Sequence, residues 1–366
     1  MFDFQVLNRI GQTCVNLREL DVSSCPVSDS GIMSLCMSLG QPDKCSKLVK
    51  LNVLSTAVTA KGAEIVISNC KQLRVFQFCD VCEVLYRLFG SQLKDKEFKQ
   101  SEQVAILPLQ YMSIQQMKAS LAPVAASIEV SCRICPYITE VYFVRGVTNQ
   151  GLMYLSTLEH LKSVTLANSE EEAITFEEGI VPLLQIRGAT IEELSLNDIN
   201  KIDIACIGAF CPNIRTLSCL VAGYGVSEFL ISSQPEVLNK GSRMFAKLID
   251  LKLLLHCPQN SFPAACLKLL FQNSLNLETL HLNNIDALTD DVMFEIFEAN
   301  SLRSTNSVRL ETCQHITAAP VWFLLEADNE LAYLNLSHCL EITRQDVEDF
   351  ERYCKSKRYN VKIVWS

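Results

Sequence analysis

The chain has 366 residues, of which 49% are hydrophobic and 20% are charged, and its formal net charge is −9. This much apolar material excludes a wholly disordered chain, and an acidic surface is unsuited to binding nucleic acid because duplex phosphates repel it. The N-terminal residues resemble no signal peptide, and no apolar run reaches the roughly 18 residues of a membrane span, so we expect neither a nucleic-acid nor a membrane partner.

A short apolar pattern recurs along the chain: one apolar residue, two variable residues, a second apolar residue, one variable residue and a third apolar residue. Its steps average roughly 28 residues, at the long end of the range of about 20–29 residues that is typical of leucine-rich repeats. The twelve copies begin at Leu17, Leu48, Leu73, Ile106, Ile138, Leu161, Ile191, Ile214, Leu248, Leu277, Thr305 and Leu331.

Each copy predicts a short strand, because alternate side chains of a strand point to opposite faces. One such strand cannot bury its apolar face alone, whereas stacked copies form a parallel sheet over a continuous core. A helix is predicted after the strand where an aliphatic residue is followed by a hydroxyl side chain that can cap a helix start. The six predicted capping residues are Ser28, Thr59, Thr148, Thr289, Thr317 and Thr343.

The predicted fold class is therefore α/β: a right-handed leucine-rich-repeat solenoid, or horseshoe, with the parallel sheet on its concave face and the helices on its convex face. We expect one solenoid of about twelve repeats over residues 1–366, with the chain beginning inside the array. Two stretches interrupt the repeat period and are predicted to be loop insertions, at about 90–103 and 222–241.

The residue between the last two apolar positions of each copy should face the concavity. Near the C-terminus these positions hold Lys252, His281, Arg309 and Asn335, a locally basic row in an acidic protein. We predict that this row binds an acidic or phosphorylated segment of a partner protein. The alternative is an ordinary solvated sheet face.

The next exposed column contains consecutive apolar residues, among them Leu54, Met112 and Val144. An exposed apolar patch is typical of a contact site, and Tyr142 beside it is a candidate anchor because aromatic residues carry much interface energy. The alternative is that neighbouring loops cover this column and make it part of the core.

Many of the 17 cysteines stand at fixed places in the repeat. In this pattern the sequence resembles the cysteine-containing repeats of F-box/leucine-rich-repeat proteins over nearly its whole length. The positions three residues before the first or after the last apolar residue hold Cys14, Cys25, Cys45, Cys70, Cys135, Cys211, Cys313 and Cys339.

That resemblance implies a substrate-recognition subunit of a cullin-type ubiquitin ligase, acting in ubiquitin-dependent protein degradation. In that family an F-box of about fifty residues upstream docks the chain on the ligase adaptor. No F-box-like segment is visible in this sequence, so an adaptor contact would need a segment upstream. The rival hypothesis is a free-standing leucine-rich scaffold or regulator, without a link to ubiquitin.

The pairs Cys79-x-x-Cys82 and Cys132-x-x-Cys135 have zinc-like internal spacing, but they lie two repeats apart. The sequence has no Gly-rich phosphate loop and no Gly-x-Ser-x-Gly motif. We therefore predict a protein that is not an enzyme and has no catalytic residues, cofactor or metal. We expect a monomer with free thiols in the cytoplasm or nucleus, where disulfides are rare.

Overall fold

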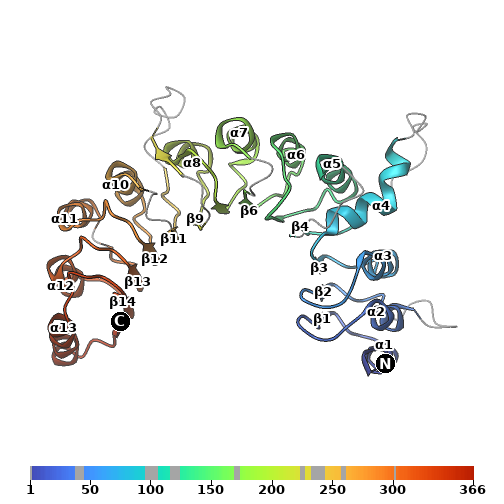
Figure 1. Ribbon diagram of the computed structural model, residues 1–366, viewed down its shortest axis with the longest axis horizontal. Helices are drawn as coiled ribbons and strands as arrows, with labels where there is room; N and C mark the ends of the chain where they lie inside the picture. Colours follow the sequence, from blue (N-terminus) through green and yellow to red (C-terminus); the bar gives the residue numbers. More distant parts are fainter. Residues whose placement is uncertain are drawn as a thin grey trace. The chain divides into compact units, whose positions relative to one another are not determined.

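The structure is a computed structural model that describes residues 2–37, 45–94, 106–115, 124–168, 174–222, 227–231, 244–256, 261–300 and 302–366 (Figure 1). Its internal contacts divide the chain into two compact units. Unit 1 comprises Met1–Val164 with Asn168–Ala173, and unit 2 comprises Thr165–Ala167 with Ile174–Ser366. The repeat period does not predict this division.

In unit 1, strands and helices alternate as the repeat pattern predicts. Strands β1, β2 and β3 pair in parallel, and so do β4 and β5. Strand β6 (Ser163–Ala167) falls at the division between the units. The elements of unit 1 are α1 (Phe2–Thr13), β1 (Glu19–Asp21), α2 (Asp29–Cys36), β2 (Lys50–Asn52), α3 (Ala60–Asn69), β3 (Val75–Gln77), α4 (Val81–Lys94), β4 (Tyr111–Ile114), α5 (Val124–Ile134), β5 (Glu140–Phe143) and α6 (Asn149–Leu155).

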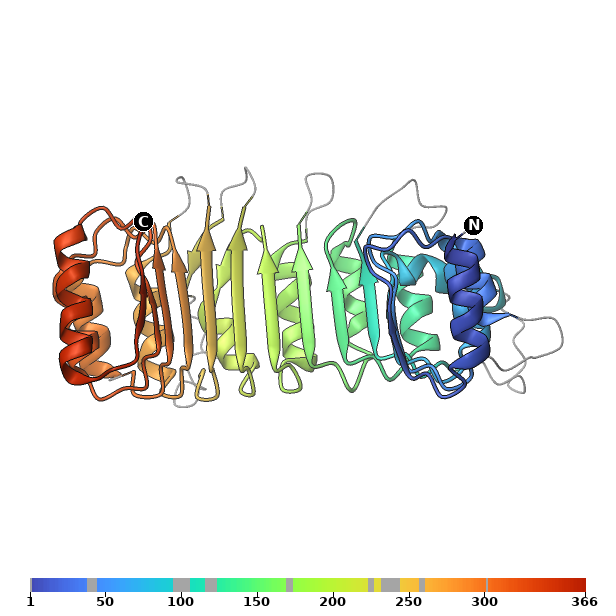
Figure 2. The same cartoon turned by 90° about the horizontal axis from the view of Figure 1, so that it is seen from below.

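In unit 2, the strands lie side by side in one parallel sheet, in the order β15-β14-β13-β12-β11-β9-β7, and the helices cover one side of it (Figure 2). A separate parallel pair joins β8 and β10. The elements are η1 (Phe176–Ile180), α7 (Val181–Arg187), β7 (Glu193–Asn197), β8 (Ile202–Asp203), α8 (Ile204–Phe210), β9 (Thr216–Val221), β10 (Phe229–Leu230), β11 (Asp250–Leu255), α10 (Ala264–Asn273), β12 (Thr279–Asn283), α11 (Asp290–Ala299), β13 (Ser307–Glu311), α12 (Ala318–Glu326), β14 (Tyr333–Asn335), α13 (Arg344–Lys357) and β15 (Lys362–Val364).

The alternation of buried and open positions along each strand explains the sheet. In β12, Leu280 and Leu282 are buried in the core, and His281 between them is only half-buried. A strand forms in each of the twelve predicted copies, and parallel strand–helix repeats build both units. The prediction of an α/β leucine-rich-repeat fold is therefore confirmed. The sequence pattern missed β15, which pairs with β14.

All six predicted capping residues stand at the N-cap of a helix. Five of them accept a hydrogen bond from a backbone N–H of the first turn. Ser28, which precedes α2, makes no such side-chain bond. Thr343 forms a full capping box, since Asp346 in turn accepts from the backbone N–H of Thr343 at 2.8 Å. Each bond satisfies a donor that a helix start leaves free.

The predicted register of the fourth copy is wrong by three residues. The pattern fits two overlapping frames here, and the structure selects the second, in which Leu109, Met112 and Ile114 are buried. Ile106, the first position of the predicted frame, is 58% exposed. Met112 pairs with Val141 of β5, a core position. Burial of apolar area decides between the frames, because the second frame places all three side chains in the core.

The predicted loop insertions are described only in part. Residues 90–94, at the start of the first predicted insertion, belong to α4, and residues 95–103 lie outside the described residues. Within the second, residues 223–226 and 232–241 lie outside the described residues. Between them, β10 forms and buries Phe229 against Phe262, with ring centroids 4.5 Å apart.

Candidate functional site

The exposed face of the unit 2 sheet carries the predicted basic row. The strand register places Lys252, His281, Arg309 and Asn335 side by side on β11 to β14. The row continues to Ser218 on β9 at one end and to Val364 on β15 at the other. The structure thus brings together four of the eight predicted contact residues. Their role in binding stays a prediction.

Two basic residues of this row have acidic neighbours. The Lys252 ammonium lies 2.7 Å from a carboxylate oxygen of Asp250, two residues earlier on the same strand. The His281 Nε2 lies 3.2 Å from a carboxylate oxygen of Glu311, although its alignment is not that of a hydrogen bond. Both contacts sit on a half-open surface, so each contributes little to stability. They nevertheless place negative charge beside two residues of the basic row, which the sequence did not predict.

The Glu311 carboxylate lies at the polar centre of this face, where it accepts hydrogen bonds from asparagines on both neighbouring strands. One of its carboxylate oxygens accepts from the Asn335 side-chain amide at 2.7 Å, and the other accepts from Asn283 at 3.4 Å. The Asn335 oxygen accepts from both the backbone N–H and the hydroxyl of Ser337, at 3.0 and 2.6 Å. Asn335 is only 8% exposed. The Asn335 amide therefore donates to Glu311 in this structure, and its role in binding a partner stays a prediction.

Arg309 and Lys362 are two basic residues of this face whose positive charge is not offset by a nearby carboxylate among the described residues. The Arg309 guanidinium carbon lies 5.2 Å from the centroid of the Tyr333 ring, and the Lys362 ammonium lies 5.9 Å from it. Both side chains are exposed, and Tyr333 is half-buried. Within the part of the chain that the structure describes, neither cation has a carboxylate at ion-pair distance. Attraction by the face of an aromatic ring holds a cation in position without neutralising it.

Two leucines adjoin the polar centre on the same face. Leu220 on β9 and Leu254 on β11 are direct neighbours in the register, and both are half-exposed. Asn197 and Asn283 flank them on β7 and β12. The sequence prediction placed its apolar patch elsewhere and did not single out this pair.

The predicted apolar patch of unit 1 is broken. Met112 is fully buried, because the corrected register turns it into the core. The residue that follows β4 is Gln115, just as Val144 follows β5. Leu54 and Val144 are half-exposed, and they come shortly after β2 and β5, which are not neighbouring strands. Tyr142, opposite Ser113 on β4, remains an exposed aromatic residue at 36%.

All four side chains of strand β4 are buried, including those on the face that is open to solvent in the neighbouring strand β5. Tyr111 and Ser113 occupy positions that are solvent-facing on other strands, yet both are buried. The Ser113 hydroxyl donates to the Phe78 carbonyl at 2.5 Å. Burial raises the pKa of Tyr111 to about 12, since the phenolate is poorly solvated there.

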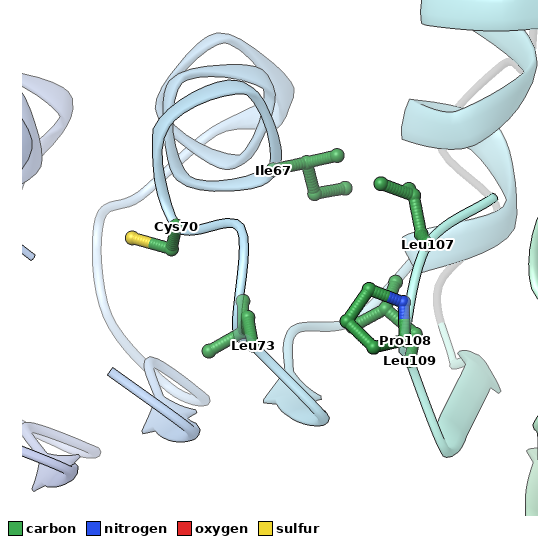
Figure 3. Close-up of a pocket in the computed structure, with 6 residues that line it drawn as sticks. All are labelled: Ile67, Cys70, Leu73, Leu107, Pro108 and Leu109. Atoms are coloured by element: carbon green, nitrogen blue, oxygen red, sulfur yellow. The ribbon is translucent and has the colours of Figure 1, made fainter. Parts of the chain in front are cut away.

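The small pocket in unit 1 suits no ligand. It measures about 10 Å³ and lies where α3 approaches the segment before β4 (Figure 3). A cavity of this size holds about one water molecule, and an apolar lining gives that water few partners. The lining residues are Ile67, Cys70, Leu73, Leu107, Pro108 and Leu109.

The described residues offer no cluster of three or more His, Cys, Asp or Glu side chains that could hold a metal ion. The thiols pack mostly in the core. Among them, Cys313 and Cys339 stand at the same point of consecutive repeats, and their thiols donate to the carbonyls of Leu282 and Leu310 at 3.8 and 3.2 Å. These bonds join each repeat to the strand of the one before it. A search of the described helices found none with the length and apolar character to cross a membrane.

The chain is similar to several solved structures. The chain resembles a chain of the Rad7 and Elc1 complex of yeast, with 12% identity over 96% of this chain and 85% of that one, at a TM-score of 0.46. A leucine-rich-repeat protein of Leptospira interrogans matches at 12% identity over 97% of each chain, with a TM-score of 0.38. The functional domain of InlJ from Listeria monocytogenes, which includes a cysteine ladder, matches at 12% identity and a TM-score of 0.35.

The InlJ match covers 90% of this chain and 66% of that one. No protein-family model matches the sequence, and no curated protein sequence matches it either. The strand register and the helix positions are what establish the leucine-rich-repeat fold of this chain.

Proposed function

We propose that this chain is a non-catalytic protein-binding scaffold that recognises its partner with the exposed sheet face of unit 2. The observation that carries the proposal is the in-register row of polar side chains from Ser218 to Asn335. These side chains stand on strands whose neighbouring residues are buried in the core. Because the packed core holds these strands in place, the face loses little conformational entropy when a partner binds.

Affinity purification from cells, followed by mass spectrometry, tests this proposal with three proteins. The first is the natural chain and the second carries Arg309→Glu on the proposed face. The third carries Arg303→Glu, an exposed arginine of the turn before β13, as a charge-matched control. We expect a set of partners that the natural chain and the control retain and that Arg309→Glu loses. Identical sets for all three proteins would contradict the proposal.

A second and finer function, substrate recognition within a cullin-type ubiquitin ligase, is favoured by the repeat cysteines. Cys313 and Cys339 play the same hydrogen-bonding role in successive repeats. This gives a physical reason for the cysteine pattern that resembles F-box/leucine-rich-repeat proteins. In this role the chain would select a protein for ubiquitin-dependent degradation.

The ligase role has its own test. We expect a cullin and its adaptor to copurify with the chain, and the abundance of partners that depend on Arg309 to rise when the chain is depleted. Partners that depend on Arg309 without any ligase component, and with unchanged abundance, would favour a free-standing scaffold instead.

A further inference from the structure

The charge balance of the unit 2 face is uneven, and this unevenness indicates the chemistry of a ligand. Lys252 and His281 lie beside Asp250 and Glu311. Arg309, one strand further along, lies over the Tyr333 ring, and no described carboxylate lies at ion-pair distance from it. An anionic group that approached Lys252 or His281 would meet a carboxylate, whereas at Arg309 it would meet a cation with free donors. Among the described residues of this face, the region between β13 and β15 is therefore the most favourable for a negatively charged group.

The spacing of the two cations favours two anionic groups over one. Arg309 and Lys362 stand on β13 and β15, with β14 between them, so their strands are about 10 Å apart. The two cations come from different strands and both stay over the Tyr333 ring, so two anionic groups, one for each cation, would satisfy both charges. Side chains at alternate positions of an extended segment are about 7 Å apart on one face. Two carboxylates in that arrangement can each meet one cation.

The leucine pair supplies a second contact at a fixed distance. Leu220 and Leu254 lie between three and four strand spacings from the midpoint of the two cations. Adding the displacement along the strands gives a separation of about 20 Å, or about six residues of extended chain. An apolar side chain at that distance would remove the exposed leucine surface from water.

Building on the proposed function, we infer that this face binds an extended acidic segment of a partner protein. Two carboxylate side chains at alternate positions meet Arg309 and Lys362. An apolar side chain about six residues away packs on Leu220 and Leu254. Tyr333 holds the two cations in place, so it is a positioning residue.

Fluorescence anisotropy with synthetic peptides tests this inference on the full chain. The first probe is a labelled peptide with two leucines and, six residues further, two aspartates at alternate positions. Its companions replace the aspartates with asparagine or with one phosphoserine, or change the spacer to two or ten residues. The peptide is also made in the reverse order, because the register does not fix its direction.

We expect the diaspartate peptide in one of the two orders to bind and the asparagine peptide to bind at least about tenfold more weakly. Arg309→Glu and Lys362→Glu should each weaken binding about tenfold, and Leu254→Ser about fivefold. The control Arg303→Glu should change it less than about twofold. Far-UV circular dichroism verifies that each variant folds, and Lys362→Gln replaces Lys362→Glu if the latter does not.

Three results would overturn the inference: equal binding of the neutral peptide, binding of the phosphoserine peptide alone, or no measurable binding of either diaspartate order. The proposed function would survive these results if partner recovery from cells still depended on Arg309. It would fail with the inference only if partner recovery were also unchanged by Arg309→Glu.

Discussion

The Asp290 carboxylate, in the first turn of α11, binds Thr317, which is the N-cap residue of the next helix, α12. One of its oxygens accepts from the Thr317 backbone N–H at 2.9 Å, and the other accepts from the Thr317 hydroxyl at 2.6 Å. Asp29 and Thr59 make the same two bonds in unit 1, at 2.7 and 2.6 Å. In both cases an aspartate in the first turn of one helix orients the N-cap of the following one. The contact therefore fixes neighbouring repeats to each other.

Removal of this carboxylate should destabilise unit 2. We expect Asp290→Ala to lower the free energy of unfolding by about 1–2 kcal/mol, because Thr317 loses both acceptors. Tryptophan fluorescence during urea unfolding measures this change. Both tryptophans of the chain, Trp322 and Trp365, belong to unit 2, so the signal reports on that unit.

Asp291→Ala is the matched control for Asp290→Ala. Asp291 is the next residue of the same first turn and is exposed, so both substitutions remove one acidic charge from the start of α11. A loss of stability as large as that of Asp290→Ala would mean that the helix dipole, rather than the bridge to Thr317, accounts for the effect.

Substitutions at two adjacent positions of β12 should differ in their effect on stability. Leu280 is buried, so Leu280→Asp places an unpaired charge in the core and should cost several kcal/mol of stability. His281 faces the open side, so His281→Asn should fold normally. Circular dichroism during thermal unfolding separates the two cases. Equal destabilisation by both substitutions would show that the register of β12 is wrong.

The thiols should differ widely in reactivity. Cys14 and Cys25 are exposed, whereas burial raises the pKa of Cys132 and of Cys219 to about 12. At pH 8 only a small fraction of such a buried thiol is ionised, and the thiolate is the reactive form. We expect iodoacetamide to modify Cys14 and Cys25 rapidly and the buried pair only after unfolding.

Peptide mass spectrometry at increasing urea concentrations measures this reactivity position by position. Because Cys132 lies in unit 1 and Cys219 in unit 2, the two thiols also show whether the units unfold together. Modification of Cys132 or Cys219 in the native protein, as fast as that of Cys14, would contradict the described burial.

Tyr111 should make unit 1 sensitive to alkaline pH. The folded pKa of about 12 exceeds the unfolded value of about 10, so the folded state retains a proton that the unfolded state releases. The associated stability is present below pH 10 and is lost as the pH rises from 10 towards 12. Between pH 9 and pH 11 the loss should be about 1 kcal/mol.

Tyr111→Phe removes this titration. Urea unfolding at pH 9 and at pH 11, followed by circular dichroism at 222 nm, should show a smaller decrease in stability for the variant than for the natural chain. If the two proteins lost stability in parallel over this range, Tyr111 would not be responsible for the pH dependence.

The repeat strands and helix starts were predictable because their signals are local. Three apolar residues at fixed spacing define each strand, and one hydroxyl marks a helix start. Around residues 106–114, however, two frames satisfy the same pattern, and only packing against the neighbouring strand selects the one that buries Met112. The pattern alone cannot distinguish two frames that are shifted by three residues, because a three-residue spacing is itself part of the pattern.

It was harder to predict which basic residues of the candidate face have acidic neighbours than to predict where the face lies. The row of Lys252, His281 and Arg309 follows from the repeat alone. The contact between His281 and Glu311 does not, since it joins residues 30 positions apart on neighbouring strands. Lys362 was missed because β15 carries no full copy of the repeat pattern.

The closed face of β4 limits what unit 1 can present to a large ligand. Because Tyr111 and Ser113 are buried, the open positions of β1 to β3 and those of β5 are two separate short surfaces. The open positions of unit 1 thus form two surfaces that can vary independently. In the continuous sheet of unit 2, by contrast, each strand pairs with its neighbours, so a substitution on one strand also alters the surroundings of the next.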